Sequence, residues 1–167
     1  MSLAAPFEVL ERFEVLIRPL DRHGAPLVLD PLNARLTGVT EDRLAAEGVP
    51  LAEALDRLGV FAGSDTLWAW GKDEFNMVAI SCYVAGIAAP IPANRFGNAP
   101  SLFLEAGVPL DVIHALRSNT MLDHFGLSLP DARGHDALGD ARMVAEALRH
   151  LMQTGALDAA HLRPQDT

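Results

Sequence analysis

Residue types that are scarce in this sequence exclude several classes of protein. Cys82 is the only cysteine, so the chain cannot form an internal disulfide, and we expect a cytoplasmic location. No apolar run is long enough to cross a bilayer, so we expect no membrane partner. The N-terminus lacks a basic segment followed by an apolar stretch, so we also expect no signal peptide.

Positive charge is scarce as well. Lysine and arginine together number 13 against 22 acidic residues, which gives a net charge of −9. Such a chain lacks the composition of a protein that binds nucleic acids through general basicity. A nuclease remains compatible, because carboxylates that hold divalent metals add negative charge of their own. The length of 167 residues and the hydrophobic content of 50% predict one compact domain with a sizeable core.

The hydrophobic pattern predicts an α/β fold. One-sided alternation over 7–18 predicts a strand that ends at Pro19, and a kinked strand or a short hairpin also fits this pattern. Residues 20–38 are expected to be rich in loops, and Thr40 is expected to cap a helix. A short buried strand is predicted over 65–70, and a loop or edge strand over 87–100.

Helical spacing covers most of the remaining chain. It predicts helices over 50–58, 74–86, 100–106, 109–117, 119–125 and from 137 onward. Because strands and helices alternate after residue 40, we expect an α/β architecture. We assign residues 1–155 to a single domain and 156–167 to a short tail that is frayed or helical.

Two acidic segments stand out as candidate sites. His135 lies five positions before Asp140, which lies at the edge of the apolar stripe of the last helix, where an unpaired carboxylate is unfavourable. Asp73 and Glu74 follow Trp70 at a strand-to-helix junction, where ligands often bind in α/β folds. For both segments the simpler interpretation is helix capping, and a histidine in a loop is commonly just solvated.

Taken in order, these segments resemble the DEDDh 3′–5′ exonucleases, the ribonuclease H-like group that includes the proofreading subunit of bacterial DNA polymerase III and RNase T. Residues 13–19 resemble the family's third strand with its terminal proline. Residues 36–40 resemble its Leu-Thr-Gly-Ile-Thr segment, and Trp70-Gly71 resembles a variant of its second motif. Residues 135–141 match its third motif, which is the most specific of these similarities.

The resemblance implies a mixed sheet flanked by helices and a two-metal mechanism that releases nucleotides from the 3′ ends of DNA or RNA. In that scheme His135 is the general base, because a histidine titrates near neutral pH. Asp140 and an acid of the second motif, Glu74 or Asp73, hold Mg²⁺ or Mn²⁺ through their oxygens. Trp70 and Thr40 are the expected substrate-binding residues, although aromatic residues of a strand usually belong to the core.

The sequence departs from the family in two ways. The first motif, Asp-x-Glu, is not in this chain, so two of the four metal carboxylates and the first two strands are missing. Three explanations of the missing motif remain open. The start of the chain was assigned too late, the chain was deliberately shortened, or the chain is a degenerate member of the family that binds without cutting. In the second motif, Glu74, Asp73 and Asn76 compete for one position. We favour Glu74, because residues 75 and 78 then fall on the face of the helix that should be buried.

We therefore expect an exonuclease whose activity is impaired in this chain. The alternative is a noncatalytic module on the same fold that binds nucleic acid or another protein, and a plain binding domain for a small acidic or phosphate ligand is a third possibility. An incomplete sheet exposes apolar edges, so we also expect a homodimer or strand exchange through residues 6–18.

Overall fold

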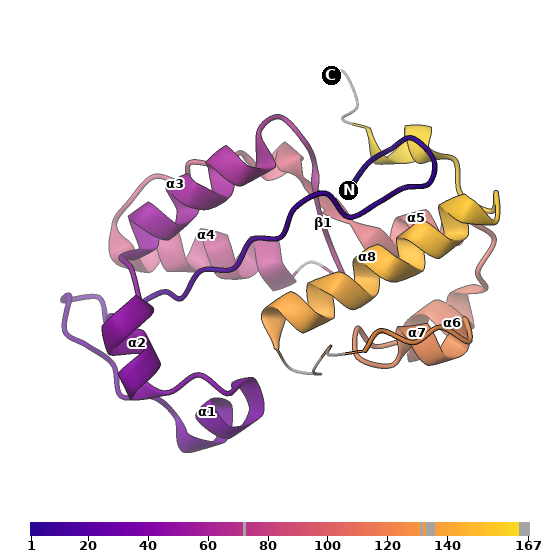
Figure 1. Ribbon diagram of the computed structural model, residues 1–167. Helices are drawn as coiled ribbons and strands as arrows, with labels where there is room; N and C mark the ends of the chain where they lie inside the picture. The colour runs from indigo at the N-terminus through magenta and orange to yellow at the C-terminus, as the bar shows by residue number, and fades with distance from the viewer. Residues whose placement is uncertain (72, 131, 133–135, 164–167) are drawn as a thin grey trace.

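The computed structural model describes residues 1–71, 73–130, 132 and 136–163. Within these residues it contains eight α-helices and a two-stranded parallel sheet, which confirms the α/β class (Figure 1). Strand β1 (Leu67–Ala69) pairs with β2 (Phe96–Asn98), and Trp68 lies opposite Gly97. The mixed sheet implied by the resemblance is therefore not confirmed by the strands of the described chain.

Gly97 explains how the two strands approach each other. A Cβ atom on this residue would lie 2.5 Å from the ring of Trp68, so only glycine leaves room for the indole here. The expectation of a loop or edge strand over 87–100 is confirmed by β2. Strand β1 has the expected place but is shorter than predicted.

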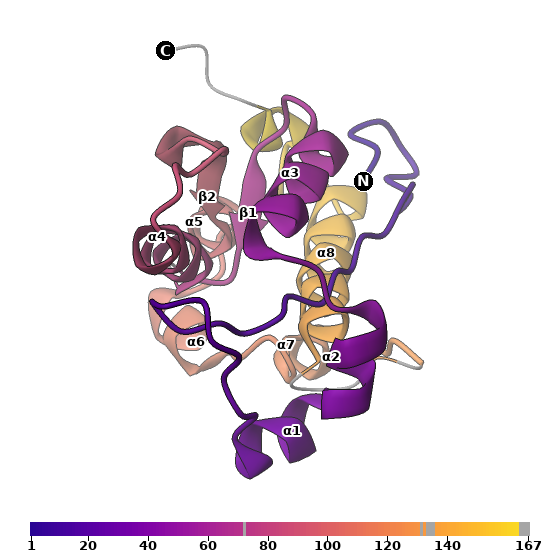
Figure 2. The ribbon, with the colours of Figure 1, turned by 90° about the vertical axis from the view of Figure 1, so that its left-hand side faces the viewer.

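The longer helices lie on the two sides of β1 in Figure 1. Helices α3 (Leu51–Ala62) and α4 (Asp73–Ala85) pack together on one side. Helix α8 (Ala137–Gln153) lies on the other side in that view and packs against two shorter helices. In Figure 2, α8 lies on the same side of β1 as α3, and α4 lies on the opposite side. The shorter helices of this half are α5 (Ala99–Glu105), α6 (Leu110–Ala115) and α7 (Met121–His124).

The hydrophobic core belongs to the C-terminal half. Phe103 of α5 and Met121 of α7 are fully buried. Helix α8 buries one apolar face against them, as its three-to-four spacing predicts. The predicted tail also contributes: its 3₁₀-helix (Ala159–Leu162) places Leu162 in the same core. None of the helices in the described chain combines the length and apolar character that a membrane span needs.

The N-terminal third contains two short helices held by local caps. Asp30 accepts hydrogen bonds from the first turn of α1 (Pro31–Thr37), a helix that the loop prediction for 20–38 missed. The Thr40 hydroxyl accepts a 3.2 Å hydrogen bond from the Arg43 N–H at the start of α2 (Glu41–Glu47), which confirms the predicted cap. Figure 1 places both helices at a corner away from β1.

The predicted strand over 7–18 is wrong. This segment contains no strand and makes only an isolated bridge between Ile17 and Val49. Within the described chain, residues 9–15, which we call the N-terminal arm, make no main-chain hydrogen bond. The alternation of side chains sorts the two faces of an extended segment, but a strand also needs a neighbouring backbone to pair with.

Candidate functional site

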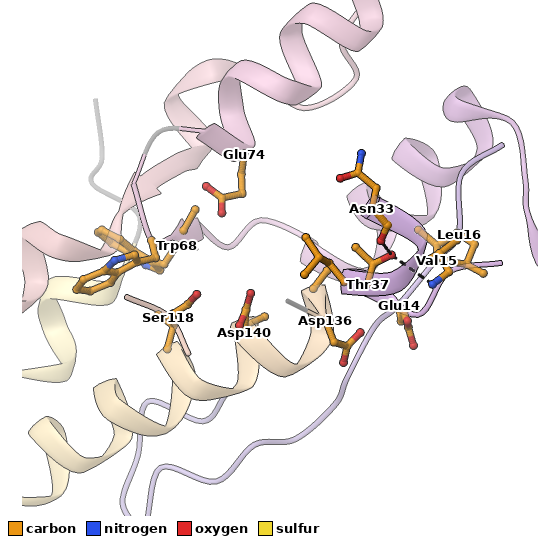
Figure 3. A pocket seen from close by; sticks show the side chains of 17 residues that line it. Glu14, Val15, Leu16, Asn33, Thr37, Trp68, Glu74, Ser118, Asp136 and Asp140 are labelled. Atoms are coloured by element: carbon orange, nitrogen blue, oxygen red, sulfur yellow. Dashed lines mark hydrogen bonds between the residues drawn. The ribbon is translucent and has the colours of Figure 1, made fainter. Parts of the chain in front are cut away.

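A cavity of about 690 Å³ lies where the N-terminal third meets the core (Figure 3). Its walls come from β1, from the starts of α4 and α8, from α1 and from the N-terminal arm. Its polar or aromatic lining residues are Glu14, Asn33, Thr37, Trp68, Trp70, Glu74, Ser118, Asp136 and Asp140. Four of these are acidic and none of the described lining residues is arginine or lysine, so the cavity attracts cations.

Two carboxylates converge in this cavity. In Figure 3 the side chain of Glu74 points from the start of α4 toward Asp140 on α8. One oxygen of Asp140, Oδ1, is buried and has no hydrogen-bond partner among the described residues. A buried carboxylate oxygen without a donor is unfavourable by about 1–3 kcal/mol or more, because it has lost its water without replacement.

Helix capping does not account for Asp140. The N-cap of α8 is Asp136, whose Oδ2 accepts a 3.1 Å hydrogen bond from the Gly139 N–H. The Asp136 side chain points away from the Glu74–Asp140 pair in Figure 3, as does Glu14. Asp140 lies in the first turn, where the helix dipole favours a negative charge. Its position therefore suits an anion, but its buried oxygen still lacks a donor or a cation.

The second-motif alternatives separate clearly in position. Glu74 lines the cavity, whereas Asp73 and Asn76 are not among its lining residues. The argument that favoured Glu74 was partly wrong, because Phe75 is 36% exposed instead of buried, although its ring packs near Phe96 with centroids 5.5 Å apart. Val78 is half-buried.

The two tryptophans have different surroundings. Trp70 is half-buried, lines the cavity and packs edge-on against Phe103, with ring centroids 4.9 Å apart. The indole N–H of Trp68 donates a 3.4 Å hydrogen bond to the carbonyl of Leu162, which ties it to the C-terminal core. Trp70 thus contacts the core and also lines the cavity. A role in the core is therefore compatible with the predicted contact to substrate.

Thr40 does not line the cavity, since it serves as the cap of α2. Thr37, three residues earlier, lines it instead. The Thr37 hydroxyl is already engaged, because it donates to the Asn33 carbonyl at 2.8 Å and accepts from the Val39 N–H at 3.2 Å. His135, the predicted general base, lies outside the described residues.

Sequence analysis missed several residues of the cavity wall. Glu14 lies in the segment over 7–18 that was predicted as a strand, and the alternation of that segment was the available signal. Ser118, whose hydroxyl lies beside Asp140 in Figure 3, follows α6 in a loop with no recognisable motif. Asn33 belongs to the missed helix α1.

The donor set at this cavity is small. Among the described residues, no group of three or more His, Cys, Asp or Glu side chains is arranged to hold a metal ion. Among the described carboxylates of the cavity, Glu74 points toward Asp140, whereas Asp136 and Glu14 point away from this pair. Comparisons with models of protein families, with curated proteins and with solved structures gave no significant match to this chain.

Proposed function

We propose that Glu74 and Asp140 bind a hard divalent cation, Mg²⁺ or Mn²⁺, and that the chain is a phosphodiesterase of the 3′–5′ exonuclease type with impaired activity. Its substrate is the 3′ end of DNA or RNA, and its expected location is cytoplasmic. Two observations support this proposal: Asp140 has a buried Oδ1 with no hydrogen-bond partner in the described chain, and the Glu74 side chain points toward Asp140 in the same cavity.

The pair fits one ion. Mg²⁺ commonly binds through one or two carboxylates and completes its shell with water and phosphate oxygens. When bound, such an ion stabilises the charge of a phosphodiester and lowers the pKa of water. The second ion implied by the resemblance would need further carboxylates, and among the described residues no group of three or more His, Cys, Asp or Glu side chains is arranged to hold a metal ion.

The remaining residues of the cavity have roles that follow from their chemistry. The Ser118 hydroxyl lies beside Asp140 and suits a hydrogen bond to a phosphate oxygen. The half-buried ring of Trp70 offers an aromatic surface for a terminal base. The role of His135 as general base comes from the resemblance alone.

A noncatalytic module that binds nucleic acid or another protein is the second candidate. It is favoured by the same small donor set, because two-metal hydrolysis normally relies on more carboxylates than the converging pair supplies. In this case the cavity binds a cation or a strand end without cutting it.

Release of 3′ nucleotides from labelled single-stranded DNA and RNA in Mn²⁺ separates the two candidates. The exonuclease proposal expects slow release that is lost in Asp140→Asn, Glu74→Gln and His135→Ala. Asp73→Asn is the matched control, because it removes a neighbouring carboxylate that does not line the cavity. Release that survives Asp140→Asn would contradict the proposal, and strand binding without release would favour the noncatalytic module.

A further inference from the structure

Strand β1 has a partner on only one of its edges within the described chain. The sheet consists of β1 and β2, so the other edge of β1 has no neighbouring strand. An unpaired edge carries free N–H and C=O groups that can pair with another extended segment. The surroundings of this edge of β1 therefore decide which extended segment can pair with it.

A groove runs along β1 between this strand and the N-terminal arm. A second cavity, of about 390 Å³, shares Trp68, Ala141 and Val144 with the Glu74–Asp140 cavity. Its other walls include Leu67 of β1 and Leu10 of the arm. We call this second cavity the β1 groove.

The side chains of this groove suit a strand with one apolar face. Helix α8 supplies an apolar wall made of Ala141, Val144, Ala145 and Leu148. An extended segment that pairs with β1 would lay alternate side chains on this wall and satisfy backbone groups at the same time. The groove thus selects an extended, alternating polypeptide.

The N-terminal arm has these properties. Residues 9–15 are extended and make no main-chain hydrogen bond within the described chain. Val9, Phe13 and Val15 share one parity, which Glu11 interrupts. Leu10 lies on the other, and Val9 and Leu10 are 41% and 66% exposed. Beyond the arm, Leu16 and Arg18 are anchored to Val49 by main-chain hydrogen bonds of 2.9 and 3.0 Å. The C-terminal end of the arm therefore stays fixed, whereas a change of partner also carries along Leu3 and Phe7, which pack against the core.

We propose that two copies of this chain exchange their N-terminal arms, so that residues 9–15 of each copy lie in the β1 groove of the other and pair with the free edge of β1. The exchange is reciprocal and forms a closed dimer, in which the same segment and the same groove are used twice. It goes beyond the proposed function, because it depends on backbone pairing and apolar burial and not on a bound cation.

Mixed cross-linking tests the exchange directly. Leu10→Cys is placed in one Cys82→Ala chain and Thr66→Cys in another, because both positions line the groove. Oxidation of the mixture is expected to give a cross-linked heterodimer, detected by nonreducing electrophoresis and peptide mapping. Only uncross-linked chains, or a light-scattering mass of one chain at every concentration, would overturn the proposal.

Arg12→Pro provides a second measurement. Arg12 is exposed, and proline removes a backbone N–H that strand pairing needs. We expect light scattering to show a monomer for Arg12→Pro and a dimer for the control Arg12→Ala, with the same circular dichroism for both. A dimer that survives Arg12→Pro and gives no Leu10–Thr66 cross-link uses another surface, such as the exposed face of α4, and would refute arm exchange.

Discussion

Residues 1–50 and residues 99–162 are organised by different interactions. The C-terminal region contains the main core, with Phe103 and Met121 fully buried. Among described residues, no hydrophobic side chain before Ala54 is buried, and Val28 is 86% exposed. Helices α1 and α2 are held by local caps, whereas α8 is held by packing of its apolar face.

The difference between the two regions shows that a stable helix needs both local capping residues and an apolar face packed against a core. Caps and turns form a short helix, but a helix of seven residues is marginal without tertiary contacts. The candidate site lies at the boundary between the two regions, since Glu14 and Thr37 come from the first and Asp140 from the second. A site of this kind can change on its open side while the core keeps Asp140 in place.

The largest difference in the free energy of unfolding is expected when one aromatic ring is removed from each region. Phe103→Ala is expected to lower the free energy of unfolding by about 3–5 kcal/mol, because the side chain is fully buried. Phe13→Ala removes a half-buried ring that stacks on Phe61 at 5.2 Å and is expected to cost about 1 kcal/mol. Urea unfolding measures both, and equal losses would contradict the assignment of the core to the C-terminal region.

The next largest effect on stability concerns Asp140, which lies at the boundary between the two regions. Without divalent cations, Asp140→Asn is expected to raise the free energy of unfolding by about 1 kcal/mol. The removal of charge from the unpaired, buried Oδ1 outweighs the lost attraction between the carboxylate and the helix dipole. Glu146→Gln on the same helix is the control. It breaks a pair with Arg149, joined by a 2.9 Å hydrogen bond, and should lower stability by about 0.5 kcal/mol or less. A loss of stability in Asp140→Asn would mean that this carboxylate is already satisfied.

The smallest effects come from matched helix caps. Asp136→Ala at α8 should lower the global free energy of unfolding by about 1 kcal/mol, since α8 belongs to the core. Thr40→Ala at α2 should leave global unfolding nearly unchanged and speed hydrogen exchange at the Arg43 amide. Hydrogen exchange and urea unfolding of both variants check this, and a global loss in Thr40→Ala would show that α2 is coupled to the core.

Periodicity and capping residues were the reliable signals in the sequence. The three-to-four spacing after residue 137 predicted α8, and Thr40 predicted the start of α2. Helix α1 was missed although Asp30 and Pro31 form a typical start, because the surrounding loop residues hid a helix of seven residues. The strand over 7–18 was wrong because pairing depends on a distant partner that local alternation does not encode.

The candidate site was predictable in part. Asp140 was singled out by an acidic residue at the edge of an apolar stripe, and Glu74 by its place after β1, and both line one cavity. Ser118 and Asn33 could not be predicted, because their approach depends on how loops and a short helix fold back onto β1. The Thr40 hydroxyl caps α2, and the substrate contact suggested by its place in a motif-like segment stays a prediction.

Calorimetric titration with Mn²⁺ tests the shared cation site most directly. The account predicts binding by the unmodified chain and by Asp73→Asn, and loss of binding in both Asp140→Asn and Glu74→Gln. An unmodified chain that does not bind Mn²⁺, or binding that is equal in all four chains, would contradict it.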